Sequence, residues 1–578
     1  MRYSLISCSE FLRRLARIRP AAADNKLETP LKRCLSAPQL TLYCVAHMVG
    51  AGLYVLTGKL LRDYTGPAAF FAYLVAAFAA IFTALCYAEF TTLFPRAGSA
   101  YLYTYLMLGE LPAFLIGWTM VSDVIVSTAA ISKAFSGTVN LLTNRTISNW
   151  LENNLVKFPS SYILDSTPDL VAVAFLMVLA IVTLTGAAIS MSINVFLSTI
   201  QIISLVILSI SCFVFGKVEN YTLHGGFFPF GIKGFLRGTG IAVFGFSGFE
   251  AIANASEESS NPRRDLPLAL FSALIICAVL YTGASLGLAY LIPHTAVVYD
   301  SPFVAAFAYV NQTGMMGFAA FATLLATGAT KLVAMYVIPR FFYSIASDGL
   351  LFGFMAYVER RTGVPVWSLL VGAVITILLA AFIQIQILVE FTSIGILFSY
   401  FIIGVDLMIL RYTFEDKYHV IDDAPKKKID PLYEDEKSVL SMLPPPKTLW
   451  LRSFAPECCK LLSSKITFCL LLGAYMLSVL MIGISMNLGV IYEITWCWIV
   501  FGCAIGLAIV LFILLCFYEP MKVKKGFETP WMPIAPCVTM LTNGVLITSL
   551  IIYFAYGLWY SKADEAAQEQ EKEQIVER

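Results

Sequence analysis

Long apolar segments follow one another along most of the chain and are separated by short polar turns. Most of these segments reach about 20 residues, the length that an α-helix needs to cross the hydrocarbon core of a bilayer. The predicted membrane-spanning segments lie at 39–61, 67–92, 112–134, 168–188, 192–215, 239–254, 267–291, 315–345, 366–388, 391–411, 466–487, 494–517 and 534–559. The pattern predicts an all-α protein that crosses a membrane many times.

Glycines interrupt two of these segments near the middle of the membrane. The first contains Val-Gly-Ala-Gly at 49–52, and the sixth contains Phe-Gly-Phe-Ser-Gly-Phe-Glu at 244–250. Each glycine weakens a helix by about 1 kcal/mol relative to alanine, and the bilayer core offers no water to freed backbone groups. Either the helices break here and offer these groups to a polar ligand, or the small residues only allow close helix packing. Interruptions at corresponding places in two halves of a chain are typical of a transporter's binding site.

The composition supports a membrane protein and argues against several other classes. Only 13% of the residues are charged, whereas soluble proteins carry about 25%. The formal net charge of +1 gives the chain as a whole no attraction for nucleic acid. The 13 cysteines lack the spacing of a disulfide framework or a zinc site. Because no nucleophile–base pair or phosphate loop is evident either, we expect no enzymatic activity, no cofactor and no metal.

Basic residues indicate which side of the membrane each turn faces. They gather before the first segment and in the turns after the sixth, eighth and tenth segments, as at Arg263, Arg360 and Lys426. All of these turns share one face, which the charge rule assigns to the cytosol together with the N-terminus. The predicted divisions are 1–38 (cytosolic N-terminal segment), 39–411 (ten-helix core), 412–465 (cytosolic linker loop), 466–560 (additional transmembrane helices) and 561–578 (charged C-terminal tail).

Three asparagines stand in glycosylation sequons on turns predicted to face the opposite side, namely Asn144, Asn220 and Asn311. The sequons and the basic residues therefore give the same orientation. We expect a multi-pass protein of the plasma membrane with a cytosolic N-terminus, an endolysosomal membrane being the alternative.

Ionisable residues within the spans are functional candidates, because a charge inside the membrane is costly. Glu250 follows the second interruption, where it could face a cationic substrate group, exchange protons or accept hydrogen bonds that lock the break. Asp123, in the third segment, is either a second acid of the site or a partner for a polar neighbour. Lys331, in the eighth segment, must pair or lose its charge, and Asp123 and Glu250 are its candidate partners. Such a pair would weaken the attraction of the site for a cation.

Three further residues are candidates for gating or modulation. His47 lies one turn before the first interruption, where it either confers pH dependence near neutrality or packs as an ordinary histidine. Glu89 and Arg340 lie toward the predicted cytosolic ends of the second and eighth segments. They could form gate ion pairs, or their side chains could simply extend to the membrane interface.

Motifs in four places resemble the cationic amino acid transporters of the amino acid–polyamine–organocation superfamily. They are residues 50–56 (GAGLYVL), residues 86–90 and 95–101 (CYAEF and PRAGSAY), residues 248–267 (from Gly-Phe-Glu to Pro267) and residues 339–351 (from Pro-Arg to Ser-Asp-Gly-Leu-Leu). The resemblance covers nearly all of residues 38–411.

The resemblance implies a fold of two five-helix inverted repeats, at 39–215 and 239–411, with about three extra spans. Helices one and six are broken in such a fold. The substrate carboxylate would meet N–H groups at the start of a half-helix, its ammonium would meet freed carbonyls, and Phe244 would be an aromatic gate. The residues implied for substrate binding are Val49, Gly50, Ala51, Gly52, Asp123, Phe244, Gly245, Ser247, Glu250 and Ala334.

Four features depart from the family pattern. Glu250 stands where the family usually has aspartate, and Lys331 replaces an apolar residue one turn from Ala334. Gln201 falls where proton-coupled bacterial relatives keep a lysine, so lysine-based proton coupling is not expected. After Trp531 one span is predicted where the family usually has two, which by parity would place the C-terminus outside.

The resulting hypothesis is a sodium-independent transporter of amino acids, with arginine, lysine and ornithine as the expected substrates. It would work by alternating access at a central site, and its partners would be a small-molecule amino acid and the lipid bilayer. Two alternatives stay open. One is a transporter of neutral amino acids with the same fold, and the other is a low-flux nutrient sensor that signals through the loop at 412–465.

Overall fold

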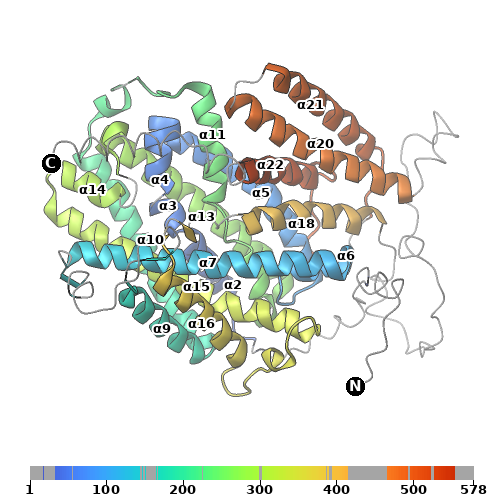
Figure 1. Cartoon of the computed structure of the whole chain (residues 1–578), viewed down its shortest axis with the longest axis horizontal. Helices are drawn as coiled ribbons and strands as arrows, with labels where there is room; N and C mark the ends of the chain where they lie inside the picture. The colour runs from blue at the N-terminus through green and yellow to red at the C-terminus, as the bar shows by residue number, and fades with distance from the viewer. Residues whose placement is uncertain are drawn as a thin grey trace.

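A computed structural model shows a helical protein (Figure 1). The structure describes residues 33–54, 56–143, 167–223, 225–298, 302–385, 394–413, 465–491, 495–521 and 526–552, with a few residues between these ranges. Two isolated β-bridges, Leu35 with Ser259 and Leu164 with Ile383, accompany the helices. Most of the predicted N-terminal segment, the linker loop and the charged tail lie outside the described residues.

The first half of the core contains one interrupted helix and four longer ones. Its elements are α2 (Ala37–Met48), α3 (Ala51–Tyr54), α4 (Leu56–Lys59), α5 (Ala69–Leu93), α7 (Glu110–Leu142), α9 (Leu170–Leu184) and α10 (Ala187–Phe215), with the short helix α6 (Ala100–Met107) between α5 and α7. The first predicted span is therefore divided at Val49 and Gly50, as the glycines indicated.

The second half repeats this order. Its elements are α11 (Gly231–Phe244), α12 (Ala251–Asn254), α13 (Pro262–Leu291), α15 (Thr313–Ser347), α16 (Val366–Phe382) and α18 (Ile394–Thr413), with the short helix α14 (Pro302–Tyr309) before α15. That the two halves are inverted repeats stays a prediction.

The predicted all-α polytopic membrane protein is confirmed. Among the described residues, 8 helices are long and apolar enough to cross a membrane, and shorter apolar helices of 10–17 residues accompany them. Helix α10 exposes large apolar side chains on its outer face, with Phe196 65% and Val214 69% exposed. Such a surface is favourable in lipid and unfavourable in water.

The broken helices lie inside the core. Helix α2 packs against α10, α13 and α15, and α5 packs against α11 and α13. Helices α20 (Lys465–Ile491), α21 (Thr495–Cys516) and α22 (Ile534–Ile552) lie together at one side of the molecule (Figure 1). Of these, α22 packs directly on α18 and α5. The additional helices thus contact the core mainly through α18 and α5.

Candidate functional site

The first break separates α2 from α3. Helix α2 begins after Ser36, whose backbone N–H donates to the Gln39 side chain at 3.0 Å in a capping box. It ends at Met48, and the backbone angles of Val49 (φ −78°, ψ 59°) are no longer helical. The Gly50 N–H donates to Met48 O at 2.8 Å, which is a tight turn instead of a helical bond. The next helix starts at Ala51, and an α-helix leaves its first N–H groups without an intrahelical acceptor.

The second break lies between α11 and α12. Residues 245–250 form turns, and Gly248 has a φ of +119°, a conformation that side chains with a Cβ rarely adopt. A Cβ placed on Gly248 would lie 2.8 Å from Cδ2 of His47. The last turn of α2 therefore packs against the middle of the second break. The two interruptions that the sequence placed far apart are in contact.

Side chains from the surrounding helices hold the carbonyls of the breaks. The Tyr281 hydroxyl on α13 lies 2.7 Å from Met48 O and 2.9 Å from Gly245 O, so it bridges the two breaks. Thr330 on α15 donates to Ala46 O at 2.8 Å, and the Gln201 amide on α10 donates to Val49 O. An unpaired carbonyl at this depth would cost several kcal/mol, so these donors stabilise the broken conformation.

Sequence reasoning missed Tyr281 and Thr330 as parts of the site. Gln201 stood out only for its position in the family resemblance, but a polar side chain within an apolar span is a signal that could have found both Gln201 and Thr330. Tyr281 carried no such signal, because tyrosine is common in membrane helices and its hydroxyl partner lies on another helix.

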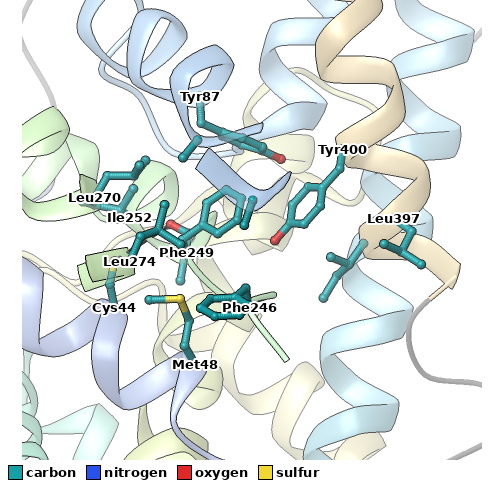
Figure 2. Close-up of a cluster of buried hydrophobic side chains, with 14 of the residues drawn as sticks. Cys44, Met48, Tyr87, Phe246, Phe249, Ile252, Leu270, Leu274, Leu397 and Tyr400 are labelled. Carbon is teal, nitrogen blue, oxygen red and sulfur yellow. Dashed lines mark hydrogen bonds between the residues drawn. The ribbon is translucent and has the colours of Figure 1, made fainter. Parts of the chain in front are cut away.

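Glu250 is buried and its carboxylate is engaged within the break. It accepts a hydrogen bond from the Gly248 N–H at 2.8 Å and another from the Tyr400 hydroxyl of α18. The Tyr400 ring stacks on Phe249 with centroids 5.0 Å apart (Figure 2). These contacts are the hydrogen bonds expected if Glu250 locks the break, and they also place a carboxylate among aromatic rings beside α2.

Asp123 and Lys331 lie on neighbouring scaffold helices, α7 and α15. Both are buried, with exposures of 4% and 2%. Of the two candidate partners of Lys331, Asp123 is the acid whose charge acts on it. The Lys331 charge also acts on His47, which links this pair to the end of α2. The site thus contains a buried lysine near one of its two expected acids.

Glu89 and Arg340 both form ion pairs, but with partners other than each other. Arg340 Nη2 lies 2.5 Å from Glu258 Oε1, with both side chains fully buried. Arg411 Nε lies 3.1 Å from Glu89 Oε1, and Arg411 also reaches Glu528 at 3.0 Å. Extension of Arg340 and Glu89 to the protein surface is therefore wrong. The reason is that Glu258, which follows α12, covers Arg340, and that Arg411 of α18 and Thr529 cover Glu89.

The ion pair of Arg340 is surrounded by hydrogen bonds to Glu257 and Glu258. The N–H groups of Cys34 and Leu35 donate to Glu258 O at 3.0 and 2.9 Å. The Ala97 N–H donates to Glu257 Oε1 at 2.9 Å. These bonds tie the 3-10 helix η5 (Ser256–Glu258), which follows α12, to the start of α2, to the turn before α6 and, through Arg340, to α15.

The remaining predicted residues are distributed as follows. Ala334 is buried on α15, and Ser247 is partly exposed in the second break. The side chains of Ala51, Gly52 and Phe244 lie outside the described part of the structure, so the expected aromatic gate at Phe244 stays a prediction.

The three sequons differ in their surroundings. Asn311 is exposed, and Asn144 lies outside the described residues. Asn220 is only 8% exposed, and its amide nitrogen donates to Tyr290 O at 2.8 Å. That contact argues against a glycan on Asn220, because the nitrogen that would carry it is buried and bonded.

Comparison with known proteins identifies the family of this chain. Residues 35–432 match the amino acid permease family. Cationic amino acid transporter 4 of Mus musculus is 32% identical over 96% of this chain and 92% of its own length. The Homo sapiens protein of the same name is 30% identical over 97% of this chain and 93% of its own length. A vacuolar cationic amino acid transporter 4 of Arabidopsis thaliana is 34% identical over 66% of this chain and 64% of its own length. The chain therefore belongs to the cationic amino acid transporters of the amino acid permease family, and is a transporter and not an enzyme.

Proposed function

We propose that this protein carries cationic amino acids across a membrane by alternating access around the two breaks. The observation that carries the proposal is the contact between His47 and Gly248, which brings the interrupted parts of α2 and α11 together. The α-carboxylate would bind the N–H groups at the start of α3. The α-ammonium would bind carbonyls around Phe244 and Gly245 and the Ser247 hydroxyl. This arrangement serves every α-amino acid and does not select a side chain.

Selection of a cationic side chain would depend on the buried acids. A cation leaving water needs an anionic partner, and Glu250 and Asp123 are the acids near the breaks. The names of the relatives favour cationic substrates. In this proposal Glu250 keeps its bond to Tyr400 in the empty site and accepts the substrate cation when the carrier is loaded.

The driving force would be the membrane potential, without sodium. Moving one positive charge across 100 mV is worth about 2.3 kcal/mol, so roughly 60 mV gives about 1.4 kcal/mol, or close to tenfold accumulation. Carbonyls of the first break already accept from Gln201, Thr330 and Tyr281. These neutral donors support a mechanism in which no sodium ion is needed to hold the break.

We propose the plasma membrane as the location, with the N-terminus in the cytosol. The basic turns support this orientation, and the exposed Asn311 would then lie outside the cell. The vacuolar relative makes an internal membrane the alternative. Enzymatic deglycosylation of intact cells distinguishes the two, because only a surface glycoprotein would shift in size.

A second candidate function follows from the position of Lys331. Its charge interacts with Asp123, so one acid of the site is partly neutralised. With less net negative charge, the site would favour neutral amino acids. The third possibility, a sensor with little flux, would show substrate binding without saturable uptake.

Uptake of labelled arginine and leucine in voltage-clamped cells tests these functions. For the proposed function, arginine enters with an inward current, and Glu250→Gln abolishes both while Glu219→Gln, an exposed loop control, leaves them unchanged. Leucine uptake without current would support the neutral alternative instead. Arginine uptake that survives Glu250→Gln would remove Glu250 from the site.

A further inference from the structure

Large aromatic side chains are exposed where the chain passes from α15 to α16. Phe352 is 70% exposed, Phe354 50% and Trp367 51%. The rings of Phe352 and Phe354 stack with centroids 5.9 Å apart, and Phe354 meets Trp367 edge to face at 6.2 Å. These three side chains form one continuous surface, the aromatic patch. Exposed apolar surfaces of this kind mark sites of contact with membranes or with other molecules.

The two neighbouring helices hold the aromatic patch in place. The 3-10 helix η7 (Gly353–Ala356) buries Met355 and packs on both α15 and α16, which lie side by side (Figure 1). The Ser368 hydroxyl on α16 donates to Met355 O at 2.7 Å. These contacts fix the exposed rings at the end of α15 and the start of α16.

A turn with two arginines follows the patch along the chain. The Glu359 N–H donates to Val364 O at 3.0 Å, and the Gly363 N–H donates to Glu359 O at 2.8 Å. These two bonds close a compact turn. Arg360 and Arg361 stand within it, and both are exposed. The turn therefore presents two guanidinium groups at the surface of the protein.

Tyr357 lies between the aromatic patch and the arginines. It is 51% exposed, and its hydroxyl donates to Glu359 Oε2 at 3.1 Å. The charge of Arg360 acts on the same hydroxyl. Glu359 is the only acid from Phe352 to Trp367, so its charge and those of the two arginines leave this segment with a net charge of +1. The segment combines exposed rings with an excess of positive charge.

This combination fits the surface of a bilayer that contains anionic lipids. The segment joins the span α15 to the apolar helix α16, so it lies where acyl chains meet headgroups. Aromatic side chains are enriched at that depth, and arginine binds phosphate in a bidentate manner. Clusters of basic residues next to a span favour anionic headgroups over neutral ones.

We propose that the aromatic patch and the turn of Arg360 and Arg361 form a binding site for an anionic phospholipid. The rings pack against its acyl chains, and the guanidinium groups bind its phosphate. The bound lipid holds the ends of α15 and α16 at the membrane surface. This inference does not depend on which substrate the protein carries.

Native mass spectrometry of the purified full-length protein tests this site, with phosphatidylserine and phosphatidylcholine as the probes. We expect the wild type to retain phosphatidylserine severalfold more than phosphatidylcholine. Arg360→Gln/Arg361→Gln should lose most of that preference. Equal retention of the two lipids by the wild type, or an unchanged preference in this double variant, would overturn the proposal.

The matched control is Arg263→Gln/Arg264→Gln. It also removes two exposed arginines, at the start of α13, which have no aromatic residue within four positions in the sequence. We expect it to prefer phosphatidylserine as the wild type does. An equal loss of preference in both double variants would show that any exposed arginine pair attracts the lipid, against a site at the aromatic patch.

Thermal unfolding distinguishes a lipid from a soluble phosphate compound. Phosphatidylserine should raise the melting temperature of the wild type by several degrees. Glycerophosphoserine, which has the same headgroup without acyl chains, should leave it unchanged, and an equal shift from both would reject the role of the rings.

Phe354→Leu removes the ring between Phe352 and Trp367 but keeps an apolar side chain, so it serves even if the arginine variant fails to fold. We expect it to lose most of the shift in melting temperature that phosphatidylserine causes. A full shift in Phe354→Leu would contradict the proposed site.

Discussion

Thr330 occupies the place where any side chain at position 50 would begin. A Cβ built on Gly50 lies 2.5 Å from Oγ1 of Thr330, and real Cβ atoms essentially never come that close to another atom. The same hydroxyl donates to Ala46 O at 2.8 Å, so Thr330 is held in place. The glycine at the first break is therefore required by the approach of α15 as well as by the tight turn.

Gly50→Ala should abolish most transport without preventing insertion into the membrane. We expect uptake to fall about tenfold or more, since a distortion of about 1.4 kcal/mol at the site already corresponds to that factor. Saturable uptake normalised to the amount of protein in the membrane measures the effect. Gly328→Ala is the control. Gly328 lies on α15, the helix that carries Thr330, and nothing lies within 4 Å of a Cβ placed there. If both variants take up substrate at the same rate, the close approach of Thr330 to Gly50 is not what makes this glycine necessary for transport.

Removal of one partner of the Arg340–Glu258 pair should destabilise the fold. Arg340→Met leaves a fully buried carboxylate without its cation, and such changes cost about 3–5 kcal/mol. We expect a large drop in the melting temperature of the purified protein, and a similar drop for Glu258→Gln. Lys217→Met, on an exposed turn, should leave it unchanged. An unaltered melting temperature in Arg340→Met would show that the pair does not hold the segment Ser256–Glu258 against α15.

The two acids that contact Arg411 should differ in how much they contribute to the stability of the fold. Arg411→Met leaves the buried Glu89 carboxylate without its cation, although Glu89 still accepts a hydrogen bond from the Thr529 N–H at 2.8 Å. We therefore expect the free energy of unfolding to fall by about 3–5 kcal/mol. Glu528 is 47% exposed, and Glu528→Gln should cost less than about 1 kcal/mol. Thermal unfolding of both variants shows which of the two acids contributes more to stability. A larger effect of Glu528→Gln would place the stabilising contact outside the buried pair.

Lys331→Met should increase uptake of cationic amino acids. The substitution keeps a long side chain and removes the charge beside Asp123, so the net negative charge of the site rises. Initial rates of arginine uptake at a fixed membrane potential should rise severalfold, whereas leucine uptake should not rise. Lys59→Met, exposed at the end of α4, is the control. A fall in arginine uptake would mean that the Lys331 ammonium supports the site rather than competing with the substrate.

The spans were predictable because lipid leaves few alternatives. The segment predicted at 112–134 lies within α7, and the interrupted segments divide at the glycines. Boundaries were less accurate where polar residues begin a helix. Helix α11 starts at Gly231 instead of 239, since Lys233 and Arg237 in its first turns lower the local hydropathy that marks a span.

Charged side chains within the core were predictable as candidates, but their partners were not. Arg340 and Glu258 are 82 residues apart in the sequence, and Glu89 lies 440 residues from Thr529. No local sequence pattern predicts such pairs, because they depend on which helix ends pack together. Tyr281 shows the same limit, as its hydroxyl acts only where α13 brings it to both breaks.

The sequence by itself determined that this chain crosses a membrane many times, and it marked the two segments in which a helix could break. Both follow from local chemistry, because the bilayer demands apolar segments and glycine weakens a helix wherever it stands. Only the tertiary structure decided that the two breaks touch, which donors hold their carbonyls and which acid interacts with Lys331. These are distances between helices, and packing sets them rather than any property of the neighbouring residues along the chain.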